Sequence, residues 1–150
     1  LGGAAYLFTG VRHASSITAR HAVIEGPEFN WSGGFLALAV GNGRYAGGGV
    51  PMCEGAMLDN GRLELSILPD VTADNIGNVL ANLLEFGFNA KTLERHVVRA
   101  RAHEFTVRSE SELQINLDGE PLHAHSFHFQ VLDRAIRLHL PAGADIVSSP

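Results

Sequence analysis

Most of the chain beyond about residue 20 alternates apolar and polar residues with a period of two, and no other feature constrains the fold as much. Leu63, Leu65 and Ile67 are separated by polar residues, which predicts a half-buried strand. The same alternation recurs over 105–108, 113–117, 127–131 and 136–140, and strand-like runs occur near 23–24 and 35–40. Short strands separated by turn residues are typical of an antiparallel β-sandwich or barrel.

Two segments break this pattern and predict helices. Apolar residues fall at helical spacing over 72–86, where Thr72 can cap the start of a helix and Gly87 can end it. Residues 1–14 form a second helix-like run. Between the predicted strands, Asn60-Gly61 is a strong signal for a two-residue hairpin. The predicted fold class is therefore mainly β: an antiparallel β-sandwich with one or two accessory helices, at about 1–14 and 72–86.

Composition limits the function. The 150 residues, 45% apolar and 18% charged, suit a single domain with one core. A net charge of -5 and a single lysine, Lys91, argue against nucleic acid and against a polybasic membrane patch. The single cysteine, Cys53, excludes an internal disulfide, fits a reducing cytoplasm and is interpreted as a small buried hydrophobe. No apolar stretch approaches the ~20 residues of a membrane span.

The pentapeptide NLDGE at 116–120 ends a predicted strand whose residues Leu113, Ile115 and Leu117 share one apolar face. It combines two carboxylates with a glycine turn. A catalytic base must be held near a substrate hydroxyl, and a tight turn at a strand end can present one. Asp118-Gly119 is also an ordinary hairpin signal. The pentapeptide alone leaves both interpretations open.

A glycine-rich segment, GNGRYAGGG at 41–49, follows the strand-like run near 35–40. Its first six residues match the G-x-G-x-x-A form of the dinucleotide fingerprint, which requires a helix directly afterwards. The residues from Gly47 to Pro51 cannot start a stable helix, so a dinucleotide site is disfavoured. A glycine loop between strands is the simpler interpretation.

Three histidines, His123, His125 and His128, lie close together in the sequence. His123 and His125 could share one face of a strand, whereas His128 has the opposite parity. The three rings would not converge on a metal without a bend in the strand. We therefore predict that they occupy the polar side of an edge strand.

Four segments, in this order, carry a family resemblance: GNGRYAGGG, AMLDNGRLEL, NLDGEPL and LHLPAG. The chain resembles the C-terminal domain of the YegS-like lipid kinases, in the bacterial diacylglycerol kinase group of the larger family of diacylglycerol, sphingosine and NAD kinases. The resemblance implies that residues 1–150 are the C-terminal β-sandwich domain of a two-domain lipid kinase. The nucleotide-binding domain, with its Gly-Gly-Asp-Gly-Thr motif, is then expected before Leu1, and that motif does not occur in these residues.

The resemblance also implies site residues. Glu120 matches the residue assigned as proton acceptor in the lipid kinases, and Asp118 would polarise the site beside it or make a turn hydrogen bond. Arg44 would face a phosphate or a lipid headgroup, or else lie exposed in its loop. The cleft between the two kinase domains would be lined by Asn42, Gly43, Arg44, Gly47 and Gly48.

A magnesium site is implied for the segment 57–62. Its ligands would be the backbone carbonyls of Met57 and Arg62 and the side chain of Asn60. The family pattern has Asn-Asp-Gly where this chain has Asp59-Asn60-Gly61, so a neutral amide replaces the charged ligand. The alternative is a plain Asn-Gly hairpin turn without a metal.

Together these features lead to a functional hypothesis. The intact enzyme would transfer the γ-phosphate of ATP to a lipid hydroxyl with Mg²⁺, in the cytoplasm or at the inner membrane surface. Its expected partners are a lipid substrate and the chain's own nucleotide-binding domain, which would bind most of the ATP, so the 150-residue chain alone is expected to be inactive. Two alternatives stay open: a non-catalytic lipid- or partner-binding module, and an NAD-kinase-like enzyme.

Overall fold

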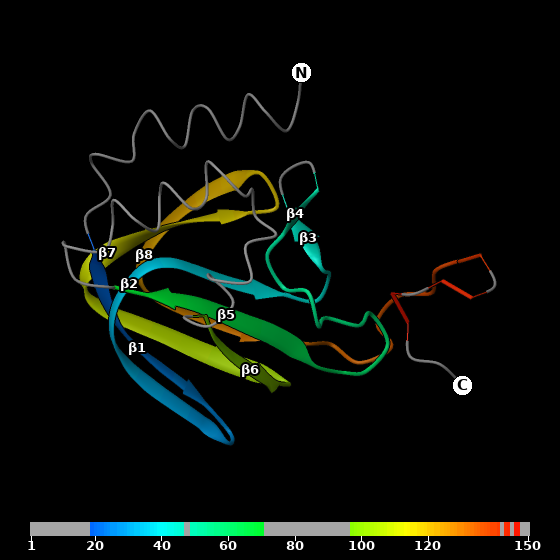
Figure 1. Cartoon of the computed structure of the whole chain (residues 1–150), viewed down its shortest axis with the longest axis horizontal. Coiled ribbons are helices and arrows are strands. Elements are labelled where there is room, and N and C mark those ends of the chain that lie inside the picture. The colour runs from blue at the N-terminus through cyan, green and yellow to red at the C-terminus, as the bar shows by residue number, and fades with distance from the viewer. Residues whose placement is uncertain (1–18, 47–48, 71–96, 142, 145, 148–150) are drawn as a thin grey trace.

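The computed structural model describes residues 19–46, 49–70, 97–141, 143–144 and 146–147 (Figure 1). The predicted helices at about 1–14 and 72–86 lie outside these residues. No helix in the described part of the chain is long and apolar enough to cross a membrane. The strands are β1 (Arg20–Gly26), β2 (Phe29–Gly41), β3 (Tyr45–Ala46), β4 (Val50–Pro51), β5 (Leu63–Pro69), β6 (Val98–Ala102), β7 (Glu104–Leu117) and β8 (Glu120–Gln130).

The strands form one large sheet and one small ribbon. The large sheet has six strands in the order β6-β5-β2-β1-β7-β8, and every neighbouring pair is antiparallel. The ribbon pairs β3 with β4. The prediction of a mainly β, antiparallel fold is therefore confirmed, whereas the described residues form no second large sheet of the kind that a sandwich requires.

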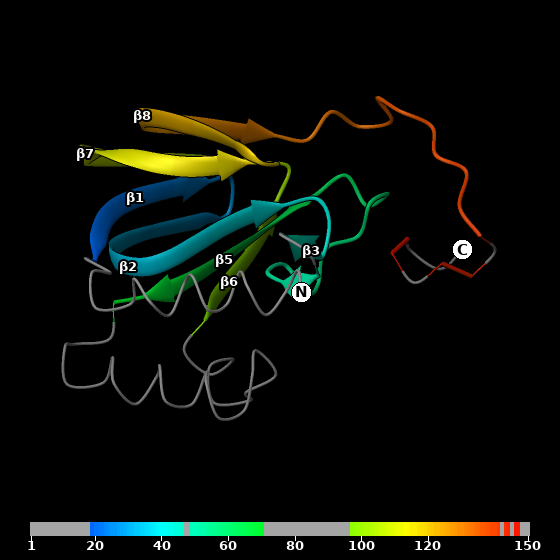
Figure 2. The same ribbon diagram turned by 90° about the horizontal axis from the view of Figure 1, so that it is seen from above.

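The long strands bend, so the large sheet curls (Figures 1 and 2). The pairing of β2 with β5 shifts register between Phe35 and Ala37, and the pairing of β7 with β8 does so between Arg108 and Leu113. Such irregularities leave residues out of the ladder and bend the strand. The bend in β7 and β8 carries the tip of their hairpin back to the end of the sheet where β3 and β4 lie (Figure 1).

The core is built mainly from β1, β5 and β7. Ile24, Leu65 and Phe105 are fully buried at its centre, and Phe29 meets Phe105 edge to face with the ring centroids 6.4 Å apart. Burial of one such large apolar side chain contributes ~1.5–3 kcal/mol relative to exposure. The buried cluster is completed by Ala22, Leu63, Ile67, Ala102, Val107 and Leu113.

The prediction that β5 is half-buried is wrong. Glu64 and Ser66, the polar residues of its alternating pattern, are buried along with their apolar neighbours. Two causes are visible. At Glu64, the side chains of Arg99 and Arg101 from the neighbouring strand β6 bind the carboxylate, and the loop 52–57 reaches it through the backbone nitrogen of Gly55.

The strand predicted at 136–140 is not formed. After β8 ends, the backbone nitrogen of Ala135 donates to the carbonyl oxygen of Leu132 at 3.3 Å, and Arg134 has a φ of 54°. Ile136 is 74% exposed, and the segment runs away from the sheet (Figure 2). An alternating sequence forms a strand only where a neighbouring strand accepts its backbone hydrogen bonds, and alternation does not specify that neighbour.

Candidate active site

Asp118 and Gly119 form the two-residue loop that joins β7 to β8. Both residues have a positive φ, 48° and 109°, as a type I′ turn requires. Leu117 pairs with Glu120 across the turn, and the backbone nitrogen of Gly119 donates to Oδ1 of Asn116 at 2.7 Å. The hairpin interpretation of NLDGE is confirmed, and the hairpin is a short, well-defined support for two carboxylates.

Both carboxylates at this tip, Asp118 and Glu120, are exposed. Leu113 in the middle of β7 is 5% exposed, whereas Leu117 beside the tip is 50% exposed. The apolar face predicted for Leu113, Ile115 and Leu117 is therefore buried at Leu113 but half exposed at Leu117. The core ends before the hairpin does, so the tip projects beyond the packed part of the sheet.

The glycine-rich segment forms a turn and the small β3–β4 ribbon rather than a strand followed by a helix. A β-carbon at Gly41 would lie 3.1 Å from Sγ of Cys53, so the backbone approaches the next loop closely there. Oδ1 of Asn42 is buried and has no hydrogen-bond partner in the described part of the chain. A β-carbon at Gly43 would meet nothing within 4 Å. Gly47 and Gly48 lie outside the described residues.

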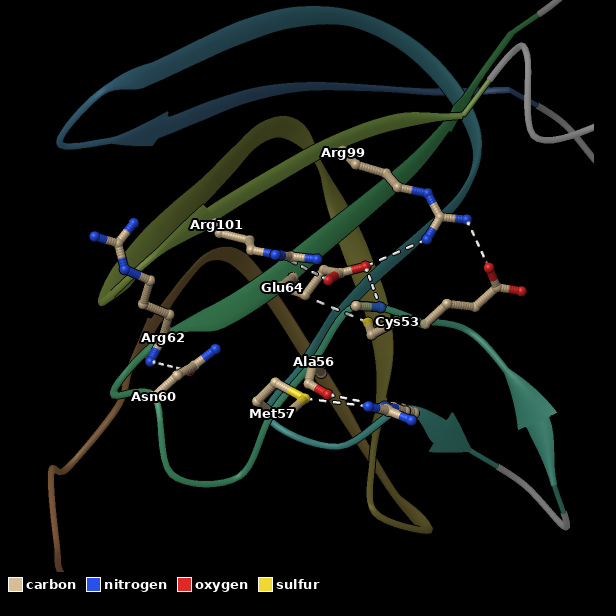
Figure 3. A network of polar contacts seen from close by, with 11 residues as sticks. Cys53, Ala56, Met57, Asn60, Arg62, Glu64, Arg99 and Arg101 are labelled. Carbon is tan, nitrogen blue, oxygen red and sulfur yellow. Dashed lines mark hydrogen bonds and ion pairs between the residues drawn. The ribbon is translucent and has the colours of Figure 1, made fainter. Parts of the chain in front are cut away.

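Arg44 turns inward and holds the loop that follows the ribbon. Its Nε donates to the carbonyl oxygen of Ala56 at 3.1 Å, and its Nη2 lies 3.1 Å from Sδ of Met57 (Figure 3). The backbone nitrogens of Met52 and Cys53 both donate to the carbonyl oxygen of Arg44 at 3.1 Å. Arg44 is therefore a half-buried residue with several partners, and it joins the glycine-rich segment to the start of the predicted metal turn.

The turn at 57–62 is stabilised by the side chain of Asn60. Its Oδ1 accepts a hydrogen bond from the backbone nitrogen of Arg62 at 2.9 Å, and Gly61 has a φ of 64° (Figure 3). The prediction of a two-residue hairpin at Asn60-Gly61 is wrong, because β5 pairs with β2 and β6 and not with the preceding strand β4. The turn is instead stabilised by this local hydrogen bond between the Asn60 side chain and the backbone of the same turn.

The residues of this turn fit a hard cation by the type of their donor atoms. Two backbone carbonyls, at Met57 and Arg62, and one amide oxygen, at Asn60, are oxygen ligands of the kind that Mg²⁺ accepts. The donor set is neutral. No group of three or more His, Cys, Asp or Glu residues that could hold a metal occurs in the described part of the chain. Any cation held by these three residues alone would therefore bind weakly.

The three histidines do not converge on one point. Nδ1 of His128 lies 3.0 Å from the hydroxyl of Thr106, whereas Nδ1 of His123 lies 3.7 Å from a carboxylate oxygen of Glu112. All three rings are exposed along β8, which is the edge strand of the sheet. The prediction that these histidines lie on the polar side of an edge strand matches their exposed positions on β8.

The alternating pattern of β5 does not reveal that the carboxylate of Glu64 is buried. Arg99 and Arg101, both on β6, bind its two oxygens at 3.3 and 3.1 Å (Figure 3). A charged residue between apolar residues of a strand is expected to face solvent, so the period-two pattern predicts that Glu64 is exposed. The only available signal is the pair of arginines at alternate positions of a second strand, which places two positive charges on one face.

Cys53 is 2% exposed, as predicted for a small buried hydrophobe. Its Sγ donates to the carbonyl oxygen of Glu64 at 3.5 Å. Burial, together with the negative charge of Glu64, raises the pKa of the Cys53 thiol from 9.0 to about 11. The thiol therefore stays protonated near neutral pH and is a poor nucleophile.

The predicted site residues fall into two groups. Arg44 connects the glycine-rich segment with the loop that leads into the 57–62 turn. The tip of the β7–β8 hairpin lies at the same end of the sheet as β3 and β4 in Figure 1, but on a separate level in Figure 2. The structure thus brings the glycine-rich segment and the 57–62 turn together and leaves the β7–β8 hairpin tip apart from them.

Known sequences resemble the whole chain. A model of the YegS C-terminal NAD kinase beta sandwich-like domain matches residues 1–140. A "probable lipid kinase YegS-like" of Pseudomonas fluorescens (strain Pf0-1) is 43% identical over 149 residues, which cover 99% of this chain and 47% of the relative. The protein of the same name from Pseudomonas aeruginosa (strain UCBPP-PA14) is 43% identical over 150 residues, covering 100% and 48%. The chain spans about half the length of these curated relatives.

Solved structures share the fold. A putative diacylglycerol kinase from Bacillus anthracis str. Sterne superposes with a TM-score of 0.65 at 20% identity, covering 89% of this chain and 43% of that chain. A crystal structure of a putative diacylglycerol kinase from the same organism gives a TM-score of 0.64 at 19% identity, covering 85% of this chain and 41% of that chain. At this identity the likeness shows the fold alone. Combined with the sequence match over nearly its full length, it shows that the chain belongs to the family of YegS C-terminal, NAD kinase β-sandwich-like domains.

Proposed function

We propose that this chain is the C-terminal domain of a two-domain lipid kinase that transfers the γ-phosphate of ATP to a lipid hydroxyl. The observation that carries the proposal is an exposed Glu120 on a two-residue hairpin tip, in a chain of this family. The curated relatives are named probable lipid kinases, and the chain covers 47% of the Pseudomonas fluorescens protein. The remaining half of such a protein has room for a nucleotide-binding domain.

Glu120 is the proposed proton acceptor. Phosphoryl transfer to an alcohol needs a positioned hydroxyl, a group that takes its proton, and cations on the ATP phosphates. The exposed carboxylate of Glu120 would take the proton from the lipid hydroxyl as its oxygen attacks the γ-phosphorus. Asp118 would polarise the site from within the same turn. The β7–β8 hairpin supports this role because its backbone positions the carboxylate without a long flexible loop.

The glycine-rich segment is proposed to line the cleft between the two domains. Gly43 borders open space, which would let a phosphate or a headgroup approach the backbone closely, and we assign the same role to Gly47 and Gly48. The unpartnered Oδ1 of Asn42 would accept a hydrogen bond from the ligand. Arg44 would contribute positive charge at the phosphate or headgroup.

Mg²⁺ is proposed to bind at the 57–62 turn and to stabilise it. The carbonyl oxygens of Met57 and Arg62 and Oδ1 of Asn60 would hold the ion. The hydrogen bond from the backbone nitrogen of Arg62 orients the Asn60 amide and leaves Oδ1 with a second lone pair for the cation. The ATP itself would be bound mainly by the other domain.

The protein would work in the cytoplasm and meet its substrate at the surface of the inner membrane. A test is transfer of radiolabelled phosphate from ATP by the full-length protein, with diacylglycerol, phosphatidylglycerol or NAD as acceptor. Label in a lipid, and none with the 150-residue chain alone, is the expected result. Label in NAD instead would favour the NAD-kinase-like alternative. A folded full-length protein that labels none of the three would favour a binding module.

A further inference from the structure

Glu64 is a buried charged residue outside the proposed catalytic groups. Its side chain is 2% exposed, and its two oxygens accept hydrogen bonds from Nη1 of Arg99 at 3.3 Å and from Nε of Arg101 at 3.1 Å (Figure 3). A buried carboxylate is costly unless several donors replace its lost hydration. Both donors come from the neighbouring strand β6, so the charge is compensated within the sheet.

The same residue also holds the loop 52–57. The backbone nitrogen of Gly55 donates to Oε1 of Glu64 at 3.1 Å, and Sγ of Cys53 donates to its carbonyl oxygen at 3.5 Å. Arg99 extends the network to Glu54, with Nη2 and Oε2 3.6 Å apart. Three consecutive residues of the loop are thus attached to Glu64 or to its partner.

The loop packs directly on the ion pair. A β-carbon at Gly55 would lie 2.4 Å from Oε2 of Glu64 and 1.7 Å from Nη2 of Arg101, both shorter than any real contact. The backbone at this position therefore rests on the carboxylate and guanidinium groups themselves. Any displacement of the ion pair would displace the loop.

The other side of the loop carries residues of the proposed site. The backbone nitrogens of Met52 and Cys53 donate to the carbonyl oxygen of Arg44, whose Nε donates to the carbonyl oxygen of Ala56 at 3.1 Å. Nη2 of Arg44 lies 3.1 Å from Sδ of Met57, where the proposed metal turn begins. The loop is therefore in contact with Glu64 on one side and with Arg44 on the other.

We infer that Glu64 is a positioning residue, which sets the place of Arg44 and of the 57–62 turn through the loop 52–57. This inference rests on the proposed function in naming Arg44 as part of the site. Glu64 is buried, whereas its partners Arg99 and Arg101 are 35% and 53% exposed. Ion pairs that bury a charge stabilise a fold little compared with apolar side chains of the same volume, so a stabilising role alone does not account for this network. A role in fixing the conformation of the loop 52–57 does account for the network.

Hydrogen exchange of the full-length protein, followed by mass spectrometry, tests the structural part. Glu64→Gln keeps the shape of the side chain and removes its charge. We expect exchange of peptides that cover 52–57 to become at least ~10-fold faster, while peptides from β1 and β7 change by less than ~3-fold. Ile24→Val is the control, because it loosens the core without contacting the loop and should give no selective change at 52–57. Unchanged exchange in the loop of Glu64→Gln, or an equal change everywhere, would overturn the inference.

A double-mutant cycle tests the functional part. Glu64→Gln and Arg44→Ala should each lower kcat/KM by between ~10- and ~100-fold, because small displacements at a phosphoryl-transfer site are costly. If Glu64 acts through Arg44, the double variant should be within ~2-fold of Arg44→Ala. Effects that multiply instead would refute the positioning role. A full-length enzyme without kinase activity would remove the proposed function, whereas an Arg44→Ala variant with normal activity would remove only the proposed role of Arg44. In either case the exchange experiment would decide on Glu64 alone.

Discussion

Gly55 and Arg101 approach each other so closely that a β-carbon at position 55 would lie 1.7 Å from Nη2 of the arginine. The Arg101 side chain is 53% exposed, but its guanidinium can move aside only by breaking the 3.1 Å ion pair between its Nε and the buried carboxylate of Glu64. Position 55 therefore requires glycine for space, and the loop depends on this one residue to reach the ion pair.

The first prediction concerns this position. Gly55→Ala should lower the free energy of unfolding by ~1–3 kcal/mol, because the added methyl group must separate Arg101 from Glu64. Urea denaturation of both proteins measures the difference. Gly43→Ala is the matched control: a β-carbon there meets nothing within 4 Å, so a change within about 0.5 kcal/mol is expected. Equal losses in the two variants would contradict the packing described for Gly55.

The second prediction concerns Glu120 in the full-length enzyme. Glu120→Gln keeps the shape of the side chain and removes the base, so turnover should fall by ~10²–10⁴-fold with little change in KM for lipid or ATP. Thermal melting should be almost unchanged, because the residue is exposed. Glu28→Gln, in the exposed turn between β1 and β2, is the control and should keep full activity. Near-normal turnover in Glu120→Gln would reduce NLDGE to a hairpin turn.

The third prediction concerns the neutral metal turn. Asn60→Asp restores a carboxylate among oxygen donors and should tighten Mg²⁺ binding, because ligand charge sets affinity at hard-cation sites. Titration calorimetry and melting with and without Mg²⁺ compare the two forms. The variant can still accept the hydrogen bond from the backbone nitrogen of Arg62, so the turn itself should survive. If Mg²⁺ leaves the melting point of both proteins unchanged, the segment 57–62 is a turn without a metal site.

The fourth prediction separates two leucines of one strand. Leu113 is 5% exposed and Leu117 is 50% exposed. Leu113→Ala should lower the free energy of unfolding by ~2–5 kcal/mol through loss of core contacts. Leu117→Ala should cost less than ~1 kcal/mol, because much of its side chain is already in water. Denaturant unfolding of both variants measures the two free energies. A larger loss of stability for Leu117→Ala than for Leu113→Ala would show that the Leu117 side chain is buried.

The fifth prediction concerns pH. Burial raises the pKa of the Cys53 thiol from 9.0 to about 11, so the unfolded chain loses this proton at lower pH than the folded chain. The unfolded state then binds fewer protons between pH 9 and 11, and the stability that depends on Cys53 falls as the pH rises through that window. The contribution amounts to at most ~2–3 kcal/mol. Urea denaturation measures the free energy of unfolding at pH 8.5 and 10.5. Its decrease between these pH values should be smaller for Cys53→Ala than for the native chain, and equal decreases would show that Cys53 is not the group responsible.

Features that depend on a few neighbouring residues could be predicted from the sequence. Asp118-Gly119 forms the expected hairpin because both residues tolerate a positive φ, and that requirement is local. The alternating residues of β1, β5 and β7 form the core because period two places them on one face. Family motifs marked Arg44 and Asn60, but not the partners to which they bind.

Features that depend on which strands become neighbours could not be predicted. Glu64 and its partners Arg99 and Arg101 lie 35 and 37 residues apart in the chain, so no local pattern connects them. Residues 136–140 have the same alternation as β5, but the described chain offers them no partner strand. Alternation states which side chains could share a face, whereas burial depends on what the rest of the chain places against that face.

The left-handed backbone at Asp118 determines which substitutions are informative at that residue. Asparagine tolerates this conformation about as well as aspartate does, whereas alanine pays ~1–2 kcal/mol to adopt it. A defect in Asp118→Ala would therefore confound a reshaped hairpin with a missing charge, and it could be mistaken for proof of a catalytic role. Only Asp118→Asn tests the electrostatic contribution of this carboxylate on an unaltered backbone, so an alanine scan would be misleading at this position.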